Sequence, residues 1–479
     1  FVSFLGSTIG LGEIPYPFSP MQRLWGTVSI YLTVVAWLYS IGALFTVLQD
    51  PLLRRLLHES GFERKVRALR EPFYLLCGYD DAGRRVTAEL TLDDVPVVVI
   101  DHDSARIDAV EIDNHALDVP ALTADAADPQ ALLIAGLRHP QCRGVLALTG
   151  DDAVNTKIAL SVRLLAPELP VYCSADDHHW HARMATAGAD AIINPFDVFA
   201  ARMAIALNQP SLHVIYEALT VQRSTVMEEP QPLPRGRWVL CGWGPLSRSL
   251  RHRLRSFGLD FHIIDANPDA SCDHVERGDP TDPQVLRRAG LENAQLLVAA
   301  TEVDIDNLAI VTAARQIAPE LPVIVRQTQR RNTPVFRASG ARLVMFTSYL
   351  VASEVLRNTR APLLGQFLEL AAGQDEAWAA TLLERLREQV GDVILESWTQ
   401  TVWQAKSPAA LIDEVRRRHG PLRAVLLMRL RFGVPELLPP DDARLLPGDL
   451  LLFAGCHRSR RLLKAQANRR TAVGAGAPA

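Results

Sequence analysis

Hydrophobic residues follow a different pattern near the N-terminus than in the rest of the chain. Residues 24–48 read LWGTVSIYLTVVAWLYSIGALFTVL and contain no charged side chain. As an α-helix, this segment would span about 37 Å, which is enough to cross a membrane core with some tilt. The basic stretch after it, RRLLHESGFERKVRALR, favours the cytoplasmic side for that end. We therefore predict one transmembrane helix followed by a cytoplasmic region; a buried core helix is the alternative.

The cytoplasmic region contains two copies of one sequence pattern. FYLLCGYDDAGRRV in the first copy corresponds to WVLCGWGPLSRSL in the second. Further motifs correspond in the same order, which predicts tandem whole domains and excludes a solenoid of short repeats. The Pro-rich stretch EEPQPLPRG, at 228–236, is the predicted linker between them.

Each copy alternates short apolar runs with helical patterns. In the first copy, residues 95–100 and 145–148 are typical of fully buried strands, and residues 157–165 of a crossover helix. This alternation predicts an α/β fold, with a doubly wound, Rossmann-like parallel sheet in each copy. From about residue 376, a helix and strands interrupted by Pro and Gly predict a small α+β lobe at the C-terminus.

Composition excludes several classes of function. The chain of 479 residues has 50 basic and 54 acidic side chains, a balance that gives no support for nucleic-acid binding. Its six cysteines lack metal or disulfide spacing, which indicates a reducing, cytoplasmic environment. No set of nucleophile, base and orienting residue is recognisable, so we do not expect an enzyme.

The turn after the first strand of the second copy has the pattern of a phosphate-binding loop. In G-x-G-x-x-S, the first glycine makes a tight turn, the second lets a phosphate approach the backbone, and the third position needs a small residue. An acid ends the next strand, as dinucleotide sites require. The candidate nucleotide-binding residues are Gly242, Trp243, Gly244, Pro245, Leu246, Ser247, Asp265, Asp279 and Thr301. The alternative is a turn kept for packing alone.

The first copy departs from this pattern at one position. Asp80 stands where the second glycine belongs, and together with Asp81 it would repel a pyrophosphate. A cation, an uncharged nucleoside group and an empty site are all open for this copy. Its weaker candidate residues are Gly78, Asp80, Gly83, Asp101, Asp125 and Thr149.

A cluster of potential metal ligands occurs at SADDHHWHARM, residues 174–184. Three histidines and two acids could bind a divalent cation. However, the two acids follow an apolar strand and precede a helical pattern, so helix capping explains them without a metal. We leave the identity of any metal site open.

A glycine-containing stretch, STIGLGE, lies just before the apolar helix. Irregular backbone at membrane depth occurs where protein buries it or where it lines a water-filled cavity. TIGLGE resembles the TVGYGD signature of potassium channels. That resemblance implies K⁺ coordination by Thr8, Ile9, Gly10 and Leu11, with Gly12 completing the filter. An ordinary loop before a helix is the alternative.

The order of parts resembles that of prokaryotic potassium channels with tandem RCK domains, also called KTN or TrkA-N domains. PGDLLLFAG resembles part of the TrkA-C lobe of that family. The resemblance implies a homotetramer in the cell (inner) membrane, surrounded by a lipid bilayer. K⁺ would be the permeant ion, and a cytoplasmic RCK gating ring would bind NAD, ADP or ATP, or Ca²⁺ or another divalent cation, and so control the gate.

Leu11 replaces the aromatic residue usual in the family's filter, and the outer helix of the family's pore is missing, as in a truncated product of a longer gene. A Trk-type nucleotide-binding regulatory subunit with a membrane anchor is the alternative function, and a tethered NAD-dependent oxidoreductase a third. The predicted organisation is a partial pore region at 1–49, a linker at 50–71, RCK domains at 72–227 and 237–375 joined by the linker at 228–236, a TrkA-C-like lobe at 376–465 and a disordered tail at 466–479.

Overall fold

The chain consists of two compact units, Phe1–Leu69 and Arg70–Ala479. The computed structural model describes residues 17–48, 51–220, 227, 229–268, 275–391, 393–402 and 407–464. The predicted filter at residues 8–12 and the predicted tail at 466–479 therefore lie outside the described residues.

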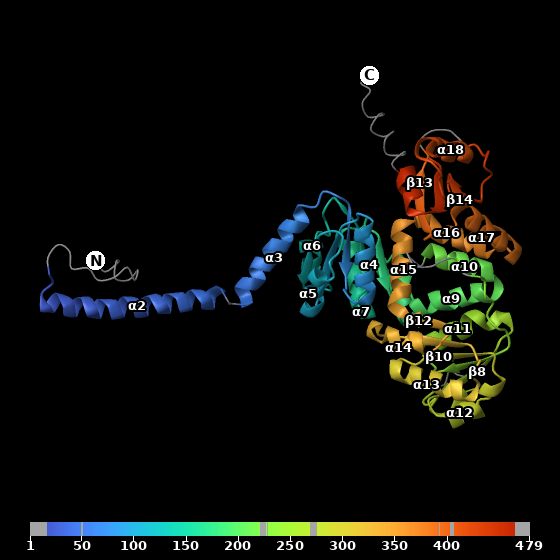
Figure 1. Ribbon diagram of the computed structural model, residues 1–479, viewed down its shortest axis with the longest axis horizontal. Helices are drawn as coiled ribbons and strands as arrows, with labels where there is room; N and C mark the ends of the chain where they lie inside the picture. The colour runs from blue at the N-terminus through green and yellow to red at the C-terminus, as the bar shows by residue number, and fades with distance from the viewer. Residues whose placement is uncertain are drawn as a thin grey trace, which may run out of the picture. The chain divides into compact units, whose positions relative to one another are not determined.

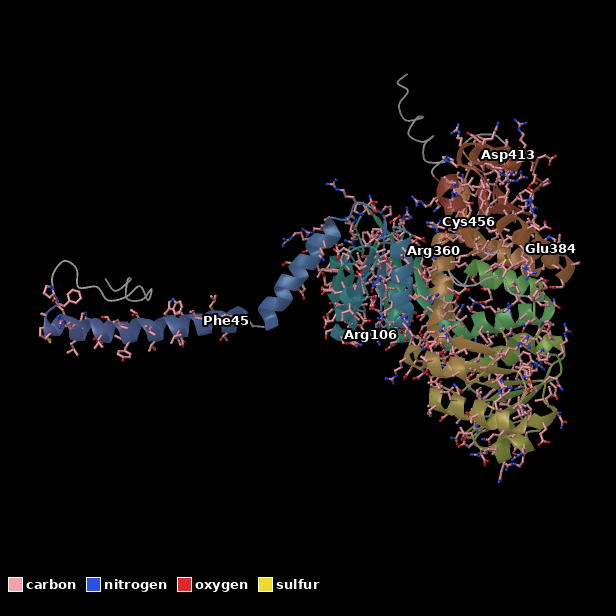
Figure 2. All side chains as sticks on the ribbon, in the orientation of Figure 1. Phe45, Arg106, Arg360, Glu384, Asp413 and Cys456 are labelled. Carbon is pink, nitrogen blue, oxygen red and sulfur yellow. The ribbon has the colours of Figure 1, made fainter. Side chains whose placement is uncertain are left out.

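The first unit contains α2 (Pro20–Leu48) and α3 (Pro51–Arg67), so most of the predicted linker at 50–71 is helical. Among the described residues, α2 is the one helix long and apolar enough to cross a membrane, and 6% of its most apolar stretch is buried within the chain. Side chains such as Phe45, which is 57% exposed, stand out along it (Figure 2). An exposed apolar surface of this extent is unfavourable in water, and a lipid bilayer would bury it.

Four hydroxyl groups of α2 form hydrogen bonds within the helix itself. Thr27, Thr33, Ser40 and Thr46 each donate to the backbone carbonyl four residues earlier, at 2.7–2.9 Å. In a hydrocarbon environment an unpaired hydroxyl is costly, and these bonds remove that cost without a partner helix. These four hydroxyl groups are thus compatible with a lipid environment.

The second unit contains the two predicted parallel sheets, each of six strands (Figure 1). Their strand orders are β3-β2-β1-β4-β5-β6 and β9-β8-β7-β10-β11-β12. In both sheets, the chain adds strands first on one side of the first strand and then on the other. Doubly wound sheets bind ligands at this switch point. The strands of the first sheet are β1 (Phe73–Cys77), β2 (Val97–Asp101), β3 (Ala121–Thr123), β4 (Cys142–Ala147), β5 (Val171–Ser174) and β6 (Ala191–Ile193). Those of the second are β7 (Arg237–Cys241), β8 (Asp260–Asp265), β9 (Val275–Arg277), β10 (Leu296–Ala299), β11 (Val323–Gln327) and β12 (Leu343–Phe346).

Helices connect the strands and cover the sheets, and most of them begin at a side-chain cap. Asp151, for example, accepts hydrogen bonds from the amides of Ala153 and Val154 at the start of α7. The helices of the first copy are α4 (Asp81–Leu92), α5 (Ser104–Ile112), α6 (Pro129–Ile134), α7 (Asp152–Leu165), α8 (His178–Ala187), α9 (Pro195–Asn208) and α10 (Pro210–Thr220). Those of the second are α11 (Pro245–Leu254), α12 (Pro283–Arg288), α13 (Asp304–Ile317), α14 (Thr333–Ala338), α15 (Thr347–Arg360) and α16 (Pro362–Ala372).

The two copies exchange the helix that follows their last strand. Phe199 and Met203 of α9 are buried against Trp238 of the second sheet. In return, Val355 of α15 is buried with Leu76 of the first sheet. Figure 1 shows the resulting neighbours, α9 beside α11 and α15 beside α4. Each sheet therefore completes its core with a helix from the other copy.

A buried arginine joins the exchanged helices. Arg202 of α9 is 3% exposed and lies 3.2 Å from a carboxylate oxygen of Glu217 on α10. Its other terminal nitrogen donates to Ser353 at 2.8 Å and lies 3.6 Å from Glu354, both on α15. Tyr216 donates to Glu354 at 2.9 Å. Although burial opposes its charge, these acids hold the pKa of Arg202 above its ordinary value.

The C-terminal lobe contains an antiparallel sheet, ordered β13-β16-β14-β15, two longer helices and a helical stretch at 457–464. Its elements are α17 (Glu376–Val390), β13 (Glu396–Thr401), α18 (Pro408–His419), β14 (Ala424–Arg431), β15 (Val434–Leu437) and β16 (Leu450–Gly455). Leu383 of α17 and Leu452 of β16 share one buried core with Leu212 of α10 and Phe367 of α16. The lobe thus packs on helices from both copies.

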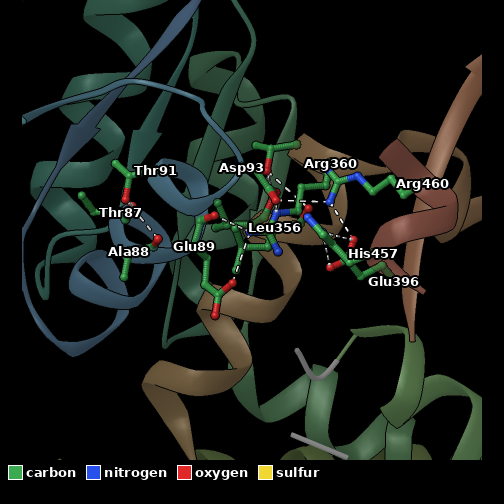
Figure 3. A network of polar contacts seen from close by, with 12 residues as sticks. Thr87, Ala88, Glu89, Thr91, Asp93, Leu356, Arg360, Glu396, His457 and Arg460 are labelled. Atoms are coloured by element: carbon green, nitrogen blue, oxygen red, sulfur yellow. Dashed lines mark hydrogen bonds and ion pairs between the residues drawn. The ribbon is translucent and has the colours of Figure 1, made fainter. Parts of the chain in front are cut away.

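A polar junction also ties the lobe to the two copies (Figure 3). Arg360, at the end of α15, bridges Glu89 at 3.2 Å and Asp93 at 2.5 Å, both contributed by the first copy. Arg460 bridges the same Asp93 at 3.2 Å and Glu396 of β13 at 3.1 Å. The first copy, the second copy and the C-terminal lobe therefore meet at one network of alternating acidic and basic side chains.

Replacing Arg202 with methionine should lower the free energy of unfolding by about 3–5 kcal/mol, because it leaves the buried carboxylate of Glu354 with one cation fewer. Urea unfolding followed by tryptophan fluorescence measures this. Arg416→Met is the control: Arg416 pairs with Asp413 at the surface, so its loss should cost less than about 1 kcal/mol. Equal effects of the two substitutions would contradict the role given to Arg202.

Candidate functional site

The first glycine of each turn is required by the backbone. Gly78 and Gly242 both have φ +99°, a conformation that residues with a side chain rarely adopt. A Cβ on Gly78 would lie 2.7 Å from the carbonyl oxygen of Leu148, and one on Gly242 would lie 3.3 Å from the amide nitrogen of Thr301. These glycines are therefore explained by the tight turn, whether or not a ligand binds.

The second position of the turn distinguishes the two copies. Gly244, the N-cap of α11, has extended backbone (φ −89°, ψ −172°), and Asp80, the N-cap of α4, has nearly the same (φ −81°, ψ −167°). A Cβ on Gly244 would make only an ordinary contact, 3.8 Å from the oxygen of Ala300. Neither the turn nor its packing therefore demands glycine at 244.

In the first copy, the side chain of the N-cap residue, Asp80, occupies the start of α4. Asp80 accepts hydrogen bonds from the amides of Ala82 at 2.9 Å and Gly83 at 3.1 Å. Burial raises the pKa of this carboxyl, and the same two amides oppose the rise. These are the amides that an anion would use. The Asp80 carboxylate therefore occupies the anion position and also repels an incoming anion.

In the second copy, the start of α11 has no side-chain cap among the described residues. Pro245 is the first helical residue and has no amide hydrogen to leave unpaired. The side chain of Leu246 is fully buried in the core of the second copy, so this residue presents its backbone to the turn. The helix start thus offers amide groups and the positive end of its dipole to an anion.

The third position also differs between the copies. A Cβ on Gly83 would lie 2.2 Å from the oxygen of Gly78, so no side chain fits there. Ser247 occupies this position in the second copy and donates its hydroxyl to the carbonyl of Gly242. Both residues are buried, in agreement with the predicted need for a small residue.

The acid at the end of the second strand holds the turn in place. Asp265 accepts from the amide of Trp243 at 2.6 Å and from that of Asn267 at 2.7 Å. Asp101 accepts in the same way from Tyr79, also at 2.6 Å. These carboxylates therefore lie beside the turn, and the backbone amides use part of their hydrogen-bonding capacity, while their role in binding a ligand stays a prediction.

The loop after β10 is fixed by an asparagine that the sequence analysis missed. Asn307 is fully buried; its side-chain oxygen accepts from the amide of Thr301 at 2.9 Å and from its hydroxyl at 2.8 Å. Asn155 does the same for Thr149, at 3.0 and 2.7 Å. Because asparagine recurs at matching positions of the two copies, the repeat itself was the available signal.

Asp279 and Asp125, the remaining predicted acids, are exposed and make local bonds. Asp279 accepts from the amide of Thr281 at 2.9 Å and Asp125 from that of Ala127 at 2.8 Å. Each bond forms a turn after an edge strand. Their contribution to a ligand site stays a prediction.

The ring of Trp243 is 8% exposed and lies near two cations. The guanidinium carbons of Arg248 and Arg251 are 5.7 and 5.6 Å from its centroid. Tyr79 replaces this residue in the first copy and bonds to Asp113 at 2.8 Å instead. Two arginines therefore lie near the aromatic ring of the turn in the second copy, whereas in the first copy Arg84 pairs with Asp113 and Arg106 with Asp101.

Within the described part of the chain, no group of three or more His, Cys, Asp or Glu side chains is arranged to hold a metal ion. In the histidine-rich segment, Asp177 caps α8 by accepting from the amide of His179 at 2.9 Å. Helix capping, as predicted, accounts for this acid.

The TrkA-N domain family matches residues 74–195 and 238–347. The two matched segments correspond to the two copies of the repeat. It is also homologous to potassium channel proteins: it is 24% identical over 218 residues to Potassium channel protein 1 of Methanocaldococcus jannaschii, an alignment that covers 45% of this chain and 63% of that protein. The chain therefore spans less than two thirds of the length of this relative.

Two further comparisons cover more of the related protein. The Trk system potassium uptake protein TrkA of Mycobacterium tuberculosis is 27% identical over 222 residues, which is 45% of this chain and 90% of TrkA. The solved GsuK channel has a TM-score of 0.52 at 16% identity, covering 97% of this chain and 91% of that chain; its NAD-bound structure scores 0.50. At this identity, the structural match shows a shared fold alone.

Gly242→Ala should destabilise the protein by about 1–2 kcal/mol, because it forces a side chain into a left-handed conformation. Gly244→Ala should change stability by less than about 0.5 kcal/mol, since its backbone is extended and its Cβ is unhindered. Urea unfolding of both variants tests the difference. Equal losses would show that Gly244 is also needed for the turn.

Proposed function

We propose that this chain is a subunit of a ligand-gated potassium channel, in which a nucleotide binds the second TrkA-N domain and changes the state of the gate. The observation that carries the proposal is the contrast between Gly244 and Asp80. The two turns have nearly the same backbone conformation. The Asp80 side chain caps the helix in the first copy, whereas no described side chain caps α11 in the second. The membrane-length helix α2, ahead of both domains, supports a channel subunit.

The chemistry of the second copy suits a dinucleotide. Its pyrophosphate would accept hydrogen bonds from the amides at the start of α11, with Arg248 and Arg251 adding positive charge nearby. Asp265 would accept from the ribose hydroxyls with the oxygen lone pairs that the turn leaves unused. Ala266 and Asn267, which follow it, provide no arginine for a 2′-phosphate, so NAD or ADP is preferred over NADP.

The proposed pore and assembly follow from the family resemblance and from homology to potassium channel proteins. Four subunits would contribute backbone carbonyls of residues 8–11 to one filter for K⁺. The part after α2 would form a cytoplasmic ring below the cell membrane. A nucleotide moves such a gate only by binding one of its states more tightly than the other.

A Trk-type regulatory subunit is the second candidate function. The alignment with TrkA covers 90% of that protein, which supports a role for this chain beside a separate transporter. In that case α2 would be an anchor. Single-channel recording from the purified full-length protein in lipid bilayers separates the two, since only a channel subunit conducts K⁺ by itself.

Gly244→Asp should lower the affinity for NAD at least about 100-fold, because the new carboxylate caps α11 and repels the pyrophosphate. Isothermal titration of the full chain in detergent measures this. Asp80→Gly is the matched control in the first copy and should leave NAD binding to the second copy intact. Unchanged affinity in Gly244→Asp would contradict the assigned site.

Gly10→Ala should abolish K⁺ current while leaving NAD affinity unchanged, because a Cβ disfavours the dihedral angles that carbonyl coordination requires. Bilayer recordings of the full-length subunit give the current, and size-exclusion chromatography checks that assembly is retained. Current equal to that of the original protein would refute the filter assignment.

A further inference from the structure

A cavity of about 440 Å³ lies between the two copies. Its wall comes from α4, α9 and α10 of the first copy and from α14, β12 and α15 of the second. The volume falls within the range of small-molecule sites. None of its lining residues belongs to the candidate nucleotide site.

The cavity is strongly basic. Arg85, Arg330 and Arg337 line it, and none of the three has an ion-pair partner among the described residues. Arg202 lines it too, but Glu217 and Glu354 neutralise that charge. Three guanidinium groups around one space, none of them in an ion pair among the described residues, attract negative charge.

Two buried polar atoms of the wall have no hydrogen-bond partner in the described part of the chain. These are the hydroxyl of Tyr349 and the Nε of Arg202, a side chain that is 97% buried. Leaving such an atom unsatisfied costs about 1–3 kcal/mol. Both atoms have less than 1 Å² of accessible surface, so they lie behind the cavity wall, and the three arginines are the groups that a ligand in the cavity can reach.

Aromatic side chains also contribute to the wall. Phe199, Phe336 and Phe346 line the cavity, and the Arg85 guanidinium stacks on the ring of Tyr349 with 4.4 Å between them. Apolar walls with a few convergent charged groups are typical of sites for organic ligands.

An adjacent cavity of about 350 Å³ has a different character. It shares Arg85, Arg330, Phe346 and Tyr349 with the first. However, its other lining residues include three acids, Asp81, Glu89 and Asp113. Its charge is balanced, so the larger cavity is the anion site.

We propose that the 440 Å³ cavity binds an aromatic organic polyanion, at a site separate from the nucleotide-binding turns. Guanidinium groups of both copies, Arg85 from the first and Arg330 and Arg337 from the second, would hold its charges. The ligand therefore links the two copies, and it stabilises the folded protein as any ligand of the native state does.

Benzene-1,3,5-tricarboxylate is a suitable probe, because it combines one aromatic ring with three carboxylates. Isothermal titration of the full chain in detergent should give saturable binding, and the probe should raise the melting temperature. Arg330→Gln and Arg337→Gln should each weaken binding at least about tenfold. Both side chains are exposed at the cavity wall, so these substitutions leave the fold intact.

Arg331→Gln is the matched control, since it removes the same charge from an exposed residue that does not line the cavity. Gly244→Asp should also leave probe binding unchanged, which separates this site from the nucleotide site. The proposal is overturned by absence of saturable binding, or by equal losses in Arg330→Gln and Arg331→Gln.

Discussion

The exchange of α9 and α15 is the constraint on which the rest of the second unit depends. Each sheet needs a helix to cover one face, and each receives it from the other copy. The buried Arg202 fixes the crossing by bonding to residues on α10 and α15 at once. The C-terminal lobe then packs on helices from both copies, and the basic cavity exists only because these helices meet.

Duplication has kept the backbone conformation of the turn, and the substitution that most changes its chemistry is Asp80 in place of Gly244. The first glycine and the acid after the second strand serve the turn in both copies, so their presence alone says little about a ligand. Asp80 and Gly244 have nearly the same backbone dihedral angles but opposite electrostatic effects. The residue that a steric argument leaves unexplained, Gly244, is therefore the more informative one about function.

The sheets, their order of elements and the turn of the second copy could be predicted from the sequence, because buried strands and glycine spacing are local patterns. The helix exchange could not, since an apolar stripe on α9 or α15 shows that it is buried but not against which sheet. Asn155 and Asn307 were missed because a single polar residue in a helix looks solvent-exposed in sequence. The basic cavity brings Arg85 and Arg330 together from distant segments, and only the tertiary structure contains that information.

The exchanged helices also make the covalent linker between the copies less important for keeping them associated. Two chains that trade identical elements form a domain-swapped dimer, and here both partners belong to one polypeptide. The core contacts of α9 and α15 hold the halves together without help from the covalent connection at 229–236. A protease that cuts this segment would therefore produce two fragments that stay associated, and one gene or two could encode the same assembly.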